Sequence, residues 1–123
     1  IWSDENHNQY DHALAELKAN PFSRRAEMIY TRPSIWSEFD KNGMSDFICT
    51  DAVQYFIRNE KLVAHVRMRS NDAIFGYKGD FAWQKHVQNK LAADLGVAVG
   101  DLIWTAGSFH IYERHLNLIG EAA

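Results

Sequence analysis

The sequence contains a single cysteine, so it cannot form an internal disulfide bond. It also lacks an apolar run of membrane-spanning length and a signal-peptide pattern. Basic residues are few, because 13 Lys and Arg stand against 16 Asp and Glu and the net charge is -3. A general nucleic-acid binder needs a basic surface. These absences predict a cytoplasmic protein with neither a nucleic-acid nor a membrane partner.

No metal-ligand spacing recurs along the chain. The acidic residues and histidines between positions 4 and 12 are typical of a charged helix start with solvated side chains. His110 and His115 lie close together in the sequence, but two histidines without a third ligand do not make a metal site. We therefore expect no bound metal.

What is present is an ordinary globular composition. The 123 residues include 46% hydrophobic and 24% charged residues, which suits one domain with a single core. The chain begins with Ile1-Trp2 and has no initial methionine. We therefore expect residues 1–123 to be one portion of a longer domain.

Two segments in the middle of the chain alternate as β-strands do. Residues 50–57 are rich in β-branched and aromatic types, and residues 62–69 place apolar side chains on one face and charged ones on the other. Asn59-Glu60 is a plausible two-residue turn between them, although glycine is usual at the second position. The pattern therefore predicts a β-hairpin.

The end of this hairpin away from the turn holds chemically active residues. With the turn centred on Asn59-Glu60, paired positions sum to 119, so Cys49 is expected opposite Ser70 and next to Arg69. A guanidinium group fixed near a thiol favours the thiolate, which is the nucleophilic form. The hairpin therefore predicts a nucleophile beside an anion site.

Two helices are expected to flank the hairpin. Residues 1–20 continue into a helical pattern that Asn20-Pro21 ends, because the residue before proline avoids the helical region. Residues 80–95 form an amphipathic helix, and Gly96 ends it. The apolar stripe expected to face the core in this second helix is Trp83, Val87, Leu91 and Leu95.

Further strands are expected at residues 28–30 and 102–112, the second one broken at Ala106-Gly107. Residues 31–46 contain Pro33 and scattered polar residues and are expected to form a loop anchored by two aromatic side chains, Trp36 and Phe39. This order of elements predicts an α+β fold, in which a mixed β-sheet packs against helices.

Several residues with chemically useful side chains, together with two glycines, form one extended motif along the chain. It consists of Cys49, Gln54, Arg69-Ser70-x-Asp72, Gly76 and Gly107-x-x-His110-x-Tyr112, with Ser23-Arg24-Arg25 upstream. This pattern, over roughly residues 8–118, resembles thymidylate synthase and the related pyrimidine-nucleotide hydroxymethylases. The resemblance implies a thymidylate synthase-like fold and a catalytic domain.

The resemblance also implies a reaction. The thiolate of Cys49 would add to C6 of a pyrimidine nucleotide, and C5 would then capture the one-carbon unit of the cosubstrate 5,10-methylenetetrahydrofolate. A synthase reduces the resulting methylene group to a methyl group, whereas a hydroxymethylase adds water to it. The implied enzyme is a transferase that needs no metal.

The remaining site residues take their roles from the same resemblance. In the family, paired arginines reach across a homodimer interface to the phosphate of the other subunit's nucleotide, and guanidinium groups suit bidentate phosphate binding. The implied assignments are Arg24, Arg25, Arg69 and Ser70 for the phosphate, His110 and Tyr112 for the sugar, and Asp72 and Gly76 for the folate.

Asp80 departs from the synthase pattern, which has Asn at this position. A carboxyl group accepts a hydrogen bond from the N4 amino group of cytosine and, when protonated, donates one to N3. Enclosure against the ring would favour this neutral form, and the O4 of uracil would meet a repulsive carboxylate. Asp80 therefore makes the chain most like the deoxycytidylate and cytidylate 5-hydroxymethylases. The alternative is that Asp80 only caps the next helix.

The predicted function is therefore 5-hydroxymethylation of dCMP or CMP. Ile48-Cys49-Thr50 replaces the Pro-Cys-His of synthases, which agrees with a cytosine substrate. Two alternatives remain: methylation of dUMP, and a catalytically silent homologue that binds nucleotide or only dimerises. The silent homologue stays open because the family's upstream glutamate, folate-stacking tryptophan and C-terminal closing segment match nothing in the chain.

Overall fold

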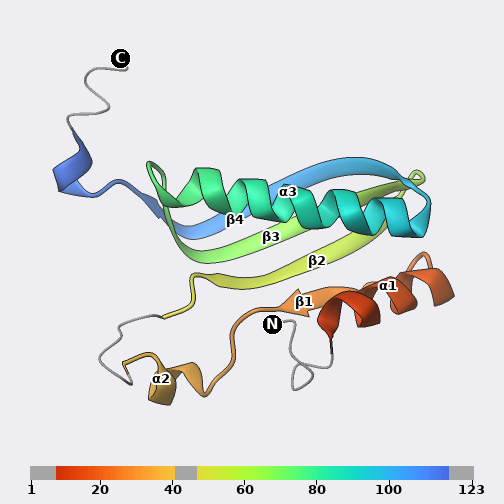
Figure 1. Cartoon of the computed structure of the whole chain (residues 1–123), viewed down its shortest axis with the longest axis horizontal. Coiled ribbons are helices and arrows are strands. Elements are labelled where there is room, and N and C mark those ends of the chain that lie inside the picture. Colours follow the sequence, from red (N-terminus) through yellow and green to blue (C-terminus); the bar gives the residue numbers. More distant parts are fainter. Residues whose placement is uncertain (1–7, 41–46, 117–123) are drawn as a thin grey trace.

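The computed structural model describes residues 8–40 and 47–116, and expectations that fall on residues 1–7, 41–46 or 117–123 lie outside these ranges. Its elements, in chain order, are α1 (Gln9–Ala19), β1 (Glu27–Ile29), α2 (Ile35–Glu38), β2 (Thr50–Arg58), β3 (Lys61–Asp72), α3 (Gly76–Leu95), β4 (Ala98–His110) and a short 3-10 turn at Glu113–His115 (Figure 1). The four strands form one sheet in the order β1-β2-β3-β4.

The sheet is mixed, as expected. β1 pairs with β2 and β2 with β3 in antiparallel fashion, whereas β3 and β4 are parallel. The parallel pair requires a crossover, which α3 supplies by carrying the chain back along the sheet (Figure 1). α3 packs on β3 and β4, and α1 packs beside α3 against β1 and β2. The predicted α+β fold is therefore confirmed.

The hydrophobic core lies between these two helices and the sheet. The four expected inward side chains of β3 are all buried, as are alternate residues of β2 and the apolar face of α1. The most completely buried members are Leu17, Met28, Val53, Tyr55, Leu62, Val66 and Leu91. Their positions confirm that period-two alternation in the hairpin separates a core face from an outer face.

The turn of the hairpin is confirmed at Asn59-Glu60. Both residues have positive φ angles, 53° and 63°, as a type I′ turn requires. Pairing then follows the predicted register as far as the pair of Ala52 with Arg67. Beyond it, a β-bulge shifts the register by one residue, so that Thr50 pairs with Met68.

The bulge corrects one prediction about the functional end of the hairpin. Cys49 does not lie opposite Ser70, because the extra residue in β2 moves it back by one position. Instead the Arg69 N–H donates to the Cys49 carbonyl oxygen at 2.7 Å. The cysteine therefore faces the arginine itself, which is a more direct contact than the regular register would allow.

Helix α3 begins at Gly76 rather than at residue 80, and it ends where expected at Gly96, whose φ is 72°. Its buried face includes Val87 and Leu91, but Trp83 is 44% exposed, so the predicted apolar stripe is wrong at its first member. Gln88 is fully buried instead, and its amide donates to the carbonyls of Leu62 and Gly100. A satisfied amide thus takes a core position that hydrophobicity alone does not predict.

The other boundaries need smaller corrections. β4 is continuous through Gly107 rather than broken there. The described part of the loop 31–46 contains one helical turn, α2, and its Trp36 is 74% exposed, so this aromatic is not a buried anchor. α1 ends at Ala19 with Asn20 as its C-cap, as predicted. None of the described helices combines the length and apolar character needed to cross a bilayer.

Candidate functional site

The first group of site residues meets where β2 begins. One guanidinium nitrogen of Arg69 lies 3.7 Å from the Cys49 sulfur. The same side chain donates to the carbonyl of Phe47 at 3.1 Å and lies 5.0 Å from the centre of the Phe47 ring. The Cys49 side chain is exposed. The arrangement is therefore an accessible thiol held next to a fixed positive charge, as the sequence predicts.

The second group lies at the end of β3 and the start of α3. Asn71 is 2% exposed, and its side-chain amide donates to the carboxyl oxygen Oδ2 of Asp80 at 3.1 Å. The indole N–H of Trp104 on β4 donates to Oδ1 of Asn71 at 3.2 Å. Three elements thus form one hydrogen-bonded chain that ends on a carboxyl group.

The environment of Asp80 is informative about its charge. Burial raises the pKa of the Asp80 carboxyl, and the hydrogen bond from Asn71 partly opposes this by lowering it. Asp80 lies in the second turn of α3, whose N-cap is Phe75. The alternative that Asp80 is only a helix cap is therefore wrong, because the helix begins four residues earlier than the sequence suggests.

Gly76 leaves space beside this carboxyl. A Cβ added to Gly76 would lie 3.3 Å from Cβ of Asp72, 3.7 Å from Nδ2 of Asn71 and 3.8 Å from Oδ2 of Asp80. Any side chain here would contact all three of these groups. The two residues assigned to folate, Asp72 and Gly76, therefore adjoin Asp80.

The residues assigned to the sugar lie at the same end of the sheet. His110 pairs with Asp72 and Ser108 with Ser70 in the parallel register of β3 and β4. The His110 and Tyr112 rings are 5.3 Å apart. The structure thus brings together the proposed sugar, phosphate and folate residues that come from β3 and from the end of β4.

The paired arginines are not part of this group within the chain. Arg25 is bound to Glu16 of α1 at 2.8 Å, and its side chain is 83% exposed. Glu27 of β1 pairs with Gln54, which lies five residues along β2 from Cys49. Arg24 and Arg25 precede Glu27 on the far side of this pair. At 3.3 Å per residue, their backbone therefore lies roughly 17 Å or more from the backbone of Cys49.

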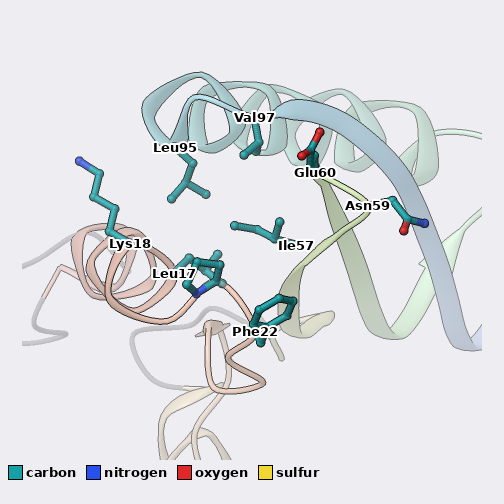
Figure 2. Close-up of a pocket in the computed structure, with 9 residues that line it drawn as sticks. Leu17, Lys18, Phe22, Ile57, Asn59, Glu60, Leu95 and Val97 are labelled. Carbon is teal, nitrogen blue, oxygen red and sulfur yellow. The ribbon is translucent and has the colours of Figure 1, made fainter.

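A separate cavity of about 580 Å³ lies at the opposite end of the hairpin. Figure 2 shows Leu17 of α1, Ile57 of β2, Leu95 of α3 and Val97 of the connection between α3 and β4 around it. It is roughly 30 Å from Cys49 along the strands. Although apolar cavities are common binding sites, none of the site residues predicted from the sequence lines this one. The Cys49 end, which gathers most of the predicted residues, is therefore the candidate functional site.

No set of three or more metal-binding side chains comes together in residues 8–40 and 47–116. The residues that sequence reasoning missed are Asn71 and Trp104. Asn71 is the unassigned position within Arg69-Ser70-x-Asp72, and a tryptophan in a sheet facing a helix needs a partner for its N–H. That need was a signal for a buried acceptor, but it does not say which residue supplies it.

Comparison with known proteins gives a consistent result. The family model described as thymidylate synthase matches residues 2–122. Deoxycytidylate 5-hydroxymethyltransferase of Enterobacteria phage T4 is 52% identical over 97% of this chain and 51% of its own length, and the T2 and T6 proteins give the same values. The chain thus spans about half the length of these curated relatives.

More distant relatives share the fold. Thymidylate synthase of Bacillus licheniformis is 34% identical over 89% of this chain and 38% of its own length. The solved structure of thermostable thymidylate synthase A from Bacillus subtilis superposes with a TM-score of 0.79 at 31% identity, covering 93% of this chain and 39% of that one. The four-stranded sheet and its helices therefore have a solved counterpart.

Proposed function

This chain belongs to the thymidylate synthase family, and we propose that the enzyme that carries it hydroxymethylates a cytidine monophosphate, dCMP or CMP, at C5. The one-carbon unit would come from 5,10-methylenetetrahydrofolate. Residues 1–123 would act within a single catalytic domain. The 52% identity to phage deoxycytidylate 5-hydroxymethyltransferase, against 34% to a thymidylate synthase, supports the choice of substrate.

The observation that carries the proposal is the Asp80 carboxyl group and its surroundings. Its partner Asn71 lies two residues from Arg69 on β3, so the carboxyl and the thiol flank the same end of this strand. Burial favours the protonated form of Asp80. A protonated carboxyl donates to N3 of cytosine and accepts from its N4 amino group, which uracil cannot match.

In the proposed reaction, the sulfur of Cys49 bonds to C6 of the base, and the ring electrons make C5 a nucleophile. The bound cosubstrate supplies a one-carbon unit to C5. The C5 proton leaves, the bond from the transferred carbon to tetrahydrofolate breaks to leave an exocyclic methylene group, water adds to that carbon, and the Cys49–C6 bond breaks to release the 5-hydroxymethyl product. The Arg69 guanidinium group, 3.7 Å from this sulfur, lies beside the reacting atom. Because the thiol must stay reduced, we place the enzyme in the cytoplasm.

The other residues position the reactants. Arg69 and Ser70 would bind the phosphate, and His110 and Tyr112 the sugar hydroxyl. Asp72 and Gly76 would bind the cosubstrate, and a Cβ at Gly76 would lie within 4 Å of Asp72 and Asp80. The proposed folate residues therefore border the proposed base-recognition residue.

We further propose that the phosphate site is completed by Arg24 and Arg25 of a second subunit in a homodimer. Their distance from Cys49 within the chain and the 83% exposure of Arg25 support this. The test is to mix two inactive variants, Cys49→Ala and the double variant Arg24→Ala/Arg25→Ala. Regained activity supports arginines acting across the interface, because one mixed site would then hold all native groups. No regained activity counts against it.

The main experiment gives the full-length enzyme methylenetetrahydrofolate and, separately, dCMP, CMP and dUMP. Mass spectrometry identifies the group attached at C5, and the Cys49→Ala variant is the matched control. A hydroxymethyl group on dCMP or CMP is the expected result, and the preferred sugar distinguishes the two nucleotides. A methyl group on dUMP would identify a variant synthase, and no product would favour a catalytically silent homologue.

A further inference from the structure

The chain of hydrogen bonds from Trp104 through Asn71 to Asp80 has a fixed direction. An indole N–H can only donate, so the Asn71 atom that it contacts at 3.2 Å must be the oxygen Oδ1. The amide NH2 group of Asn71 therefore points the other way, toward Oδ2 of Asp80 at 3.1 Å. Trp104 thus removes the ambiguity between the two ends of an asparagine amide.

This direction decides where a proton can lie on Asp80. Oδ2 accepts from the Asn71 amide, and the carbonyl oxygen of a neutral carboxyl group accepts a hydrogen bond more strongly than its hydroxyl oxygen does. A proton on the carboxyl group is therefore favoured on Oδ1. Asn71 is 2% exposed, so water does not replace this contact easily.

A carboxyl group with its proton on one defined oxygen is no longer symmetric. It offers a donor at Oδ1 and an acceptor at Oδ2. Cytosine presents an acceptor at N3 next to a donor at N4, and it matches this pair in one orientation. Uracil presents a donor at N3 next to an acceptor at O4, and in the same orientation it would need the proton on Oδ2.

We propose that Asn71, oriented by Trp104, is a specificity-determining positioning residue that directs the proton of Asp80 to Oδ1 and so selects cytosine over uracil. This rests on the proposed function, because it assigns a role toward the base that Asp80 is proposed to bind. Gly76 contributes by leaving the space beside Asn71 and Asp80 free of any side chain.

The test compares kcat/KM for dCMP and for dUMP in the full-length enzyme and its variants. Asn71→Leu keeps a similar volume and removes both hydrogen bonds, and we expect the ratio of the two kcat/KM values to fall about 10-fold or more. Trp104→Phe keeps an aromatic ring but removes the N–H together with the pyrrole part of the indole, so the Asn71 amide is free to rotate by about 180°. We expect this variant to lower the same ratio by roughly 3-fold.

Gln84→Leu is the matched control, because Gln84 is another buried amide of α3, 3% exposed, in the helical turn that follows Asp80. It should leave the ratio unchanged. In an Asp80→Asn background, Asn71→Leu should also leave the ratio unchanged, since the proton that it directs is gone. Thermal unfolding of each variant separates loss of fold from loss of selectivity, and Trp104→Phe tests the inference if Asn71→Leu does not fold.

The outcomes are distinct. Equal loss of activity on both nucleotides in Asn71→Leu and Trp104→Phe, with an unchanged ratio, would overturn the inference and leave the proposed function standing. A wild-type enzyme that prefers dUMP would overturn the proposed function and the inference with it. A fall in the ratio limited to the Asn71 and Trp104 variants supports the inference.

Discussion

The two ends of the β2–β3 hairpin use the same two strands in opposite ways. At the turn end, β2 and β3 pair with each other in a regular register, and side chains of α1 and α3 line an apolar cavity beside β2 (Figure 2). At the other end a β-bulge shifts the register, and Cys49 and Arg69 are both exposed. Regular pairing and burial hold the turn end in place, whereas the irregular end presents polar groups to solvent.

This difference explains how one small sheet can be both stable and reactive. Apolar burial at the turn end supplies the stability, at about 25 cal/mol per Å² of buried apolar surface. The functional end contributes less burial and can therefore tolerate a bulge, a glycine at a close contact and a half-buried carboxyl group. Variants at the two ends should consequently change different properties of the protein.

The largest effect is expected for Cys49→Ala at the functional end. Removing the nucleophile should lower the rate of product formation at least about 1,000-fold. The thermal unfolding midpoint should hardly change, because the Cys49 side chain is exposed. Product analysis and calorimetry on the full-length enzyme measure the two quantities. Retained activity would show that Cys49 is not the nucleophile.

The opposite behaviour is expected for Leu62→Ala near the turn. Leu62 is fully buried, so the free energy of unfolding should fall by about 2–5 kcal/mol through lost burial and a new cavity. Urea denaturation measures this loss. Val63→Ala is the control, because Val63 is on the outer face and only half-buried, and its loss should be smaller. Equal losses would mean that the two faces of β3 do not differ as described.

Gly107→Ala should have an intermediate effect on both properties. The added Cβ would lie 2.9 Å from the backbone oxygen of Arg69, so the two strands must move apart. We expect a loss of about 1–3 kcal/mol in unfolding free energy, together with lower activity as Arg69 shifts. Chemical denaturation and the dCMP assay measure the two effects.

Gly79→Ala is the matched control for Gly107. Gly79 lies inside α3, and an added Cβ would have no atom within 4 Å. Alanine should therefore stabilise the helix by about 0.5–1 kcal/mol. If both alanine variants changed the free energy of unfolding in the same direction, close contact with Arg69 would not be the reason for glycine at position 107.

A gain in stability of similar size is expected for Glu60→Gly at the turn. Glu60 has a φ of 63°, a left-handed conformation in which glycine is not strained. We expect the free energy of unfolding to rise by about 0.5–1 kcal/mol after the greater flexibility of unfolded glycine is subtracted. Lys61→Gly, one residue later in β3, should instead lower it. A loss for Glu60→Gly would mean that its side chain stabilises the turn.

The smallest effect is the pH dependence of stability due to Asp80. Burial raises its folded pKa above the ordinary value of 3.8, so its contribution to stability is fully present below that value and is lost as the pH rises through the folded pKa. Asp80→Asn cannot titrate. We therefore expect the unfolding free energy of Asp80→Asn to increase relative to wild type between pH 4 and pH 7. Urea denaturation across this range measures the difference in unfolding free energy between Asp80→Asn and wild type. A difference that stayed constant or decreased with rising pH would contradict the prediction.

Much of the fold follows from local pattern. Alternation along residues 50–57 and 62–69 predicts the two strands and their buried faces, and Gly96 predicts the end of α3. The start of α3 does not follow, because Gly76 to Gly79 contain two poor helix formers that tertiary contacts hold in the helix. The prediction that Trp83 is a core residue is wrong for the same reason, because the docking of α3 on the sheet, rather than the spacing of apolar residues, decides which face of the helix is buried.

The sequence by itself determined which residues are chemically capable, and it placed Cys49 close to Arg69, because a two-residue turn and period-two pairing are local properties. The tertiary structure decided that a bulge sets these two side chains face to face. It also decided that Trp104, Asn71 and Asp80 form one directed chain of hydrogen bonds. Residues 33 positions apart in sequence meet only when strand register and helix docking bring them together, and local periodicity does not encode either one.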